Sequence, residues 1–92
     1  MERSSRAHAI EIALREKLEA EHVEVIDQSS FHEGHLGAQD GGHFHVVVVS
    51  QQFRGLSRLA AQKVVYEALG ALMETEIHAL SMRTMTPEKW SG

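Results

Sequence analysis

The stretch that decides the fold is HFHVVVVSQQFRGLSRLAAQKVVY, residues 43–66. Its first part contains four consecutive valines, which are β-branched and form a run too short for a preferred helix. The polar residues that follow, together with Gly55, predict a turn over 51–55. Ser57 is a suitable N-cap for a helix. The stretch therefore predicts a buried strand, a tight turn and a helix packed against the strand.

The residues before this stretch predict a helix and a strand. A helix over 4–20 can be capped by Ser4 or Ser5, and its apolar residues recur every three or four positions. These apolar residues are Ile10, Ala13, Leu14 and Leu18. A short β-branched run predicts a strand over 23–27, and the glycine-rich and serine-rich segment 28–42 predicts an irregular connection.

The strand over 43–50 is expected to pair antiparallel with the strand before it. A second helix is predicted over 58–73, with Gly70 inside it at a cost of about 1 kcal/mol relative to alanine. The apolar residues assigned to its packed face are Leu59, Ala60, Val64, Ala68, Leu69 and Leu72. A third strand over 77–84 follows, and a right-handed crossover would place it parallel to the strand over 43–50.

The C-terminal residues predict one more turn of helix. Thr86 is an N-cap, Pro87 stands at the first helical position and Glu88 is an early acid. This turn is expected to place Trp90 against the body of the protein. The chain, residues 1–92, is thus predicted to be a single α+β domain of order αββαβ, with a three-stranded mixed sheet and helices packed on one face.

Composition argues against several classes of protein. The 92 residues include no cysteine, so the chain can form neither a disulfide nor a thiolate metal site of its own. No stretch approaches the ~20 apolar residues needed to span a bilayer, so we expect a cytoplasmic protein that does not bind membranes. Phosphate-binding loops and nucleophile elbows are absent, so we do not expect an enzyme.

Seven histidines are the unusual feature of this composition. His32 and His35 lie three positions apart in the glycine-rich segment, a spacing that allows both to reach one ion. His43 and His45 lie two positions apart on a strand and share a face. A histidine at a strand end more often bonds a neighbour than binds a metal, whereas for the two loop histidines the alternatives are about even.

His78 lies near the start of the third predicted strand. Strand alternation places it on one face with Leu80 and Met82, with Ile77 and Ala79 on the other. Neither face is then clearly the solvent face. His78 is therefore either a buried, hydrogen-bonded group or a residue at the rim of a site.

Four motifs resemble the BolA family in order and spacing. They are HFxVxVVSxxFxGLS over 43–57, VVYxAL over 64–69, IHAL over 77–80 and TPEKW over 86–90. The resemblance runs over nearly the whole chain and implies a BolA fold, which is similar to the class II KH domain. It also implies that the protein forms a heterodimer with a monothiol glutaredoxin and shares a glutathione-dependent [2Fe–2S] cluster with it, in iron–sulfur trafficking or iron regulation.

The resemblance implies two histidine ligands for this cluster. His78 matches the histidine of the family's IHAL motif. The family's second ligand is a cysteine or histidine from the loop between the first two strands, and this chain has no cysteine. His35 matches the H-x-G-H pattern best, and His32 is the alternative. Imidazole in place of thiolate raises the reduction potential of such a cluster. The isolated chain is expected to be a monomer without a cofactor.

The resemblance also implies an alternative, because some BolA proteins are described as transcriptional regulators that contact DNA. Arg54, Arg58 and Lys63 are the basic residues of this hypothesis. The family usually has Arg-His-Arg in the long helix, whereas this chain has Ala61, Gln62 and a lysine, which removes phosphate contacts. The net charge of −4 also disfavours a broad nucleic-acid surface.

A third hypothesis needs no partner protein. His32, His35 and one strand histidine could together bind a single zinc ion. We rank the cluster partner first, the nucleic-acid-binding protein second and the zinc site third.

Overall fold

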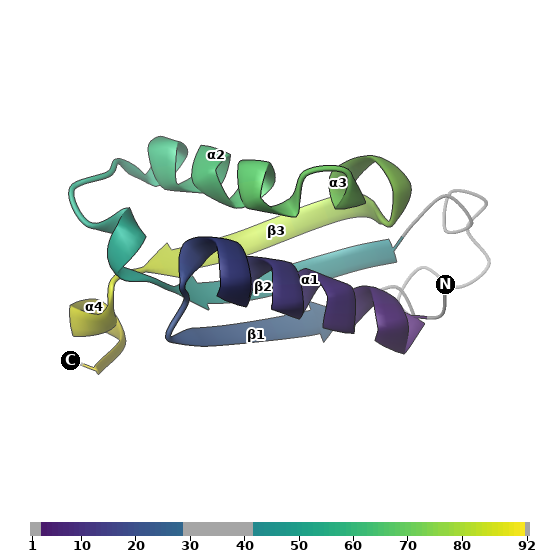
Figure 1. The fold of residues 1–92 in the computed structure, drawn as a ribbon, viewed down its shortest axis with the longest axis horizontal. Coiled ribbons are helices and arrows are strands. Elements are labelled where there is room, and N and C mark those ends of the chain that lie inside the picture. The colour runs from purple at the N-terminus through teal and green to yellow at the C-terminus, as the bar shows by residue number, and fades with distance from the viewer. Residues whose placement is uncertain (1–2, 29–41, 92) are drawn as a thin grey trace.

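The computed structural model describes residues 3–28 and 42–91. Figure 1 shows how the helices and strands follow one another along the chain. They are α1 (Arg3–Leu18), β1 (His22–Asp27), β2 (Gly42–Val49), the 3₁₀-helix η3 (Gln51–Phe53), α2 (Arg58–Leu69), α3 (Leu72–Thr75), β3 (Ile77–Met85) and α4 (Pro87–Ser91).

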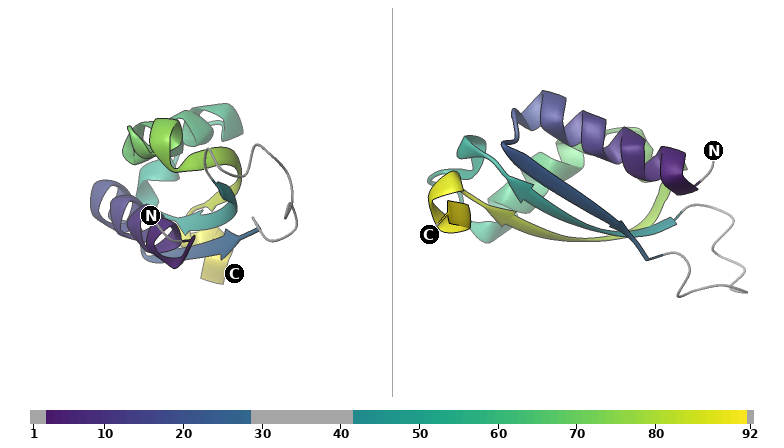
Figure 2. Two further views of the ribbon diagram at one scale, coloured as in Figure 1. Left: turned by 90° about the vertical axis from the view of Figure 1, so that its right-hand side faces the viewer. Right: turned by 90° about the horizontal axis from the view of Figure 1, so that it is seen from below.

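β2 is the central strand of a three-stranded sheet. β1 pairs with it antiparallel and β3 pairs with it parallel. Parallel neighbours need a long crossover connection, and α2 with α3 supplies it. α1 and α2 lie side by side over the same face of the sheet, while the described residues place no long helix on the other face (Figures 1 and 2). The predicted α+β class, strand directions and one-sided helix layer are therefore confirmed.

The hydrophobic core lies between the sheet and the two long helices. Alternation along β2 turns Phe44, Val46 and Val48 toward the helices, and each of these side chains is at most 1% exposed. The other buried apolar residues of the core are Ile10, Leu14, Leu18, Val23, Phe53, Ala61, Val65, Ala68, Leu69 and Ile77. Burial of this apolar surface is the main term that stabilises so small a domain.

Ser50 ties the end of β2 to the end of α1. The hydroxyl of this fully buried residue donates a hydrogen bond to the carbonyl of Leu18 at 2.7 Å. Its Oγ also accepts the backbone N–H of Gln52 at 3.0 Å and so caps η3. Ser57 caps α2 as predicted, since its Oγ accepts the N–H of Ala60 at 3.1 Å.

Two predictions about helix ends are wrong. α1 begins at Arg3, so Ser4 and Ser5 lie inside its first turn and not at the N-cap position. α2 ends at Leu69 because Gly70 has a φ of 53°, in the left-handed region, and the short helix α3 follows separately. Gly70 therefore ends the helix predicted to contain it.

The buried face of α2 also differs from the prediction. Leu59 was assigned to that face, but its side chain is 64% exposed. Ala61 and Val65, which were not assigned to it, are buried, whereas Ala68 and Leu69 are buried as predicted. The contacts of α2 with α1 and β3 decide which stripe is covered, because apolar residues occur on more than one side of this helix.

Candidate functional site

The face of the sheet opposite the long helices, here called the open face, carries the strand residues that alternate with the core. Its members are His22, Glu24 and Ile26 of β1, His43, His45, Val47 and Val49 of β2, and Ala79, Ser81, Arg83 and Met85 of β3. Three strand histidines therefore share this face. The central strand provides two of them because they alternate with Phe44, Val46 and Val48, which lie on the opposite side.

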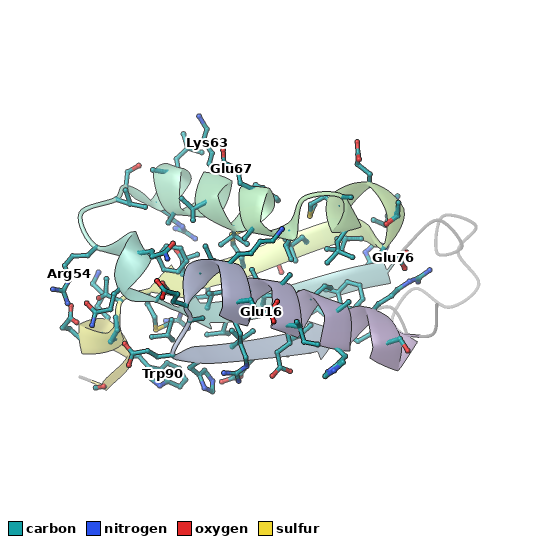
Figure 3. All side chains as sticks on the ribbon, in the orientation of Figure 1. Glu16, Arg54, Lys63, Glu67, Glu76 and Trp90 are labelled. Atoms are coloured by element: carbon teal, nitrogen blue, oxygen red, sulfur yellow. The ribbon has the colours of Figure 1, made fainter. Side chains whose placement is uncertain are left out.

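α4 covers one end of the open face. Trp90 stacks on the imidazole of His22, with ring centroids 4.5 Å apart and planes at 20°, and Figure 3 labels this tryptophan beside β1. Val49, whose register partners are His22 and Met85, is fully buried although it faces away from the long helices. The predicted contact of Trp90 with the body is confirmed. α4 lies at the end of the sheet where β3 finishes, and no other helix of residues 3–28 and 42–91 lies over the open face at the end where β3 begins (Figures 1 and 2).

His78 lies in a β-bulge at the end of the sheet away from α4. Gly42 is in register with Ile77, and the next residue of β2, His43, is in register with Ala79. One residue of β3, His78, therefore has no register partner on β2. The face that alternation predicted for His78 is wrong, because the extra residue shifts the alternation of β3: Ile77 packs in the core, whereas His78 is exposed.

The bulge brings His78 next to a second histidine. Its ring centroid lies 5.1 Å from that of His43, with the two planes tilted by 52°. The backbone below this pair is fixed, because the N–H of Gly42 donates to the carbonyl of Glu76 at 3.0 Å. The side chain of Glu76 in turn accepts a hydrogen bond from Arg6 at 3.0 Å in a half-buried ion pair.

The connection that contains the two predicted loop ligands starts and ends beside His43. Gln28 is the last described residue before this connection, and its N–H donates to the carbonyl of His43 at 2.7 Å. After the connection, β2 begins at Gly42. His32 and His35 lie outside the described residues, so their assignment as ligands stays a prediction. The end of their segment at Gly42 lies next to Ile77 in register and so beside His78, whereas the end at Gln28 lies on the β1 side of β2.

His45 does not join this pair. Its Nδ1 lies 2.7 Å from the hydroxyl oxygen of Ser81, its register partner on β3. This agrees with the expectation that a strand histidine bonds a neighbour. Within residues 3–28 and 42–91, no group of three or more histidine, aspartate or glutamate side chains is arranged to hold a metal ion. A site with three protein ligands would therefore need residues from outside this part of the chain.

A groove runs along the outer side of β3, next to the beginning of α2. Its volume is about 760 Å³. Its lining includes Leu56, Arg58, Met82, Arg83, Thr84 and Lys89. Three of these residues are basic, and they come from α2, β3 and α4, so the groove attracts anions.

Only one of the three basic residues predicted to bind nucleic acid lines this groove. Arg58 does so, but Arg54 forms an ion pair of 2.6 Å with Glu88 of α4. Lys63 points away from the sheet on the outer side of α2 (Figure 3). The prediction missed Arg83, although the regular alternation of β3 beyond the bulge could have identified it as an outward-facing residue.

No helix in the described part of the chain is long and apolar enough to cross a membrane.

Comparison with known proteins identifies the family. A family model described as BolA-like protein matches residues 14–89. BolA-like protein 1 of Mus musculus is 36% identical over 91 residues, which cover 95% of this chain and 65% of the mouse protein. The DNA-binding transcriptional regulator BolA of Escherichia coli is 35% identical over 83 residues, covering 90% of this chain and 77% of that protein.

Solved structures agree with this result. The BolA domain of SufE1 from Arabidopsis thaliana superimposes with a TM-score of 0.80 at 33% identity, over 92% of this chain and 95% of the domain. The solution structure of BolA1 from Mus musculus gives a TM-score of 0.77 at 34% identity, over 94% of this chain and 68% of that chain. The chain spans slightly less than two thirds of the length of the mouse relative. The family model, the relatives and the fold together show that this chain belongs to the BolA-like family.

Proposed function

We propose that this protein is a non-enzymatic partner of a monothiol glutaredoxin, with which it holds a shared, glutathione-dependent [2Fe–2S] cluster. The observation that carries the proposal is the position of His78. The bulge lifts this imidazole out of the core, and among the described residues it is exposed, at the end of the open face that α4 does not cover, where a partner protein can reach it.

The chemistry of the available side chains supports the proposal. Imidazole is a good ligand for iron, and a cluster held partly by imidazole has a higher reduction potential than one held by four thiolates. This chain has no cysteine, so the thiolates would come from the glutaredoxin and from glutathione. The second imidazole would be that of His35 or His32, because both belong to the segment that ends at Gly42, which is in register with Ile77 beside His78.

The test is anaerobic cluster reconstitution with a monothiol glutaredoxin and glutathione, followed by visible circular dichroism as this protein is added. We expect the spectrum to change and to saturate near one equivalent. His78→Ala should abolish the change. His45→Ala is the matched control and should leave it intact, since His45 bonds Ser81 on the same face.

The loop ligand follows from the same titration. The variant of His35 or His32 that abolishes the spectral change identifies the second ligand. A cluster with imidazole ligands should also be lost in mild acid, because a protonated imidazole cannot bind a metal. An unchanged glutaredoxin spectrum, with no heterodimer by size-exclusion chromatography, would show that the proposal is wrong.

The basic groove favours one alternative, namely DNA binding and transcriptional regulation. The Escherichia coli relative is named as a DNA-binding transcriptional regulator. Arg58 and Arg83 lie in the groove, whereas Lys63 does not. If the groove binds duplex DNA, Arg83→Ala should lower the slope of log affinity against log salt by about 0.9, the value for one phosphate contact. Lys63→Ala should leave the slope unchanged, and equal effects of the two variants would exclude the groove.

A further inference from the structure

Glu76 is the residue immediately before β3, and its polar groups have partners in three different elements. Its N–H donates to the carbonyl of Leu72 at 2.9 Å and so closes α3. Its carbonyl accepts the N–H of Gly42, the first residue of β2, at 3.0 Å. Its carboxylate accepts a hydrogen bond from Arg6 of α1 at 3.0 Å. This one residue therefore ties α1, α3 and β2 to the start of β3.

His78 lies two residues after this junction. The bulge leaves it without a register partner on β2, so its position is set by the residues on either side of it. On the C-terminal side, Ala79 is in register with His43. On the N-terminal side, the chain is fixed by Ile77, which is 4% exposed in the core, and by the contacts of Glu76.

The ion pair of Arg6 with Glu76 is the long-range member of these contacts. The two residues are 70 positions apart in the chain, and their side chains are 17% and 19% exposed. Solvent and salt therefore screen this pair much less than a surface pair. Loss of one partner leaves a partly buried charge unpaired, which disturbs its surroundings. The ion pair of Arg15 with Glu11 on the same helix is 45% and 40% exposed, so its loss should have little effect.

We propose that Arg6 and Glu76 are positioning residues for His78. Their ion pair fixes the start of β3, and through it the direction in which the bulge presents the imidazole. Neither residue is itself a ligand. The consequence for the cluster rests on the proposed function: a fixed imidazole increases the affinity of the complex, because less conformational entropy is lost when a preorganised group binds.

The first test uses the full chain without glutaredoxin. Arg6→Glu and Glu76→Arg each place two like charges at the junction, whereas the double variant Arg6→Glu/Glu76→Arg restores an ion pair with the partners exchanged. Amide hydrogen exchange at Gly42 and the NMR signals of the His78 ring are measured for all three variants. The ring signals are sensitive to position because the ring of His43 lies 5.1 Å away.

We expect each single variant to shift the ring signals of His78 and to speed exchange at Gly42 by about tenfold or more through local opening. The double variant should bring both measurements back toward those of the wild type, because the coupling between the two positions is restored. Arg6→Met keeps most of the aliphatic stem and removes the charge. It should give smaller changes in the same direction, and it decides the question if a like-charge variant does not fold.

Two controls separate positioning from a general loss of stability. The amide of Val65 lies in the buried part of α2, and its exchange should accelerate much less than that at Gly42. Arg15→Glu makes the same charge change at the exposed pair of the same helix. It should alter neither the exchange at Gly42 nor the signals of His78.

The second test is the cluster titration with the same variants. Each single variant should weaken the complex by about threefold to tenfold, which is less than the 10–100-fold typical of a residue bonded directly to a metal ligand. The double variant should regain affinity, and Arg15→Glu should keep that of the wild type.

Three results would overturn the proposal. They are unchanged exchange at Gly42 and unchanged His78 signals in the single variants, equal effects of Arg15→Glu, and a double variant that recovers none of the measured properties. If the wild-type protein itself produces no change in the glutaredoxin spectrum, the proposed function fails. The measurements on the free protein then decide the positioning role without it, so the two failures are distinguishable.

Discussion

The two faces of the three-stranded sheet differ although they are made by the same strands. On the helix side, Phe44, Val46 and Val48 of β2 are buried and join one core. On the open face, the alternating residues of the same strand include His43 and His45, which are half-buried. Strand alternation determines on which face each side chain lies. The helices determine from which of the two faces water is excluded. The comparison predicts that substitutions of neighbouring residues have very different effects on stability.

The largest contrast is expected between Phe44→Ala and His45→Ala. Phe44 is 1% exposed at the centre of the core, and its truncation should lower the free energy of unfolding by about 3–5 kcal/mol. His45→Ala removes a single hydrogen bond on the open face and should cost about 1 kcal/mol or less. Urea unfolding followed by circular dichroism measures both, and similar losses would contradict the division of the faces.

Val46→Ala and Val47→Ala sharpen the comparison, because the chemical change is the same at adjacent positions. Val46 is fully buried, so its variant should lose about 2 kcal/mol through transfer and cavity terms. Val47 lies half-buried on the open face and should lose about 0.5 kcal/mol. A greater loss at Val47 would mean that a partner or a second copy covers the open face in solution.

Substitution of two serines tests how the ends of helices and strands are held, rather than how the two faces of the sheet differ. Ser50→Ala leaves the carbonyl of Leu18 and the N–H of Gln52 without their side-chain partner in a buried place, at a cost of about 1–3 kcal/mol. Ser57→Ala removes an exposed N-cap and should cost about 1 kcal/mol. Thermal unfolding of the two variants side by side gives the order, and the reverse order would show that Ser50 is not buried in solution.

The smallest effect concerns the covered end of the open face. Trp90→Ala removes the stack on His22 and should cost about 0.5–1.5 kcal/mol, because the tryptophan is itself 46% exposed. The NMR signals of the His22 ring should also move, since they lose the ring current of the indole. Leu59→Ala is a control at a 64% exposed apolar residue, and it should shift neither stability nor these signals. Unmoved His22 signals in Trp90→Ala would show that the stack does not form.

Much of the fold could be predicted because its signals are local. The four valines, the N-cap at Ser57 and the motif that starts α4 each depend on backbone geometry over a few residues. The helix end at Gly70 was missed for the same reason, since the residues on both sides of it continue an apolar pattern. A left-handed glycine ends the helix there, and periodicity alone does not reveal it.

For the candidate site too, features that depend on a few neighbouring residues were predicted, and features that depend on contacts between distant segments were not. The resemblance pointed to His78, and strand alternation was then applied to it with the wrong result, because a bulge changes the alternation by one residue. The basic groove was only partly anticipated. Arg58 is far in the chain from Arg83 and Lys89, and nothing in their local sequence indicates that they line one groove.

By itself, the sequence determined the type of each main element, most of the core residues and the presence of histidines without any cysteine. These properties depend on side-chain type and on the helix and strand periods, which are set within a few residues of chain. Only the tertiary structure decided that His78 is exposed beside His43, and that α4 covers one end of the open face but not the other. The physical reason is that strand register and helix docking are fixed by contacts between segments that are distant in the chain. The energies of these contacts cannot be inferred from the pattern of a few neighbouring residues.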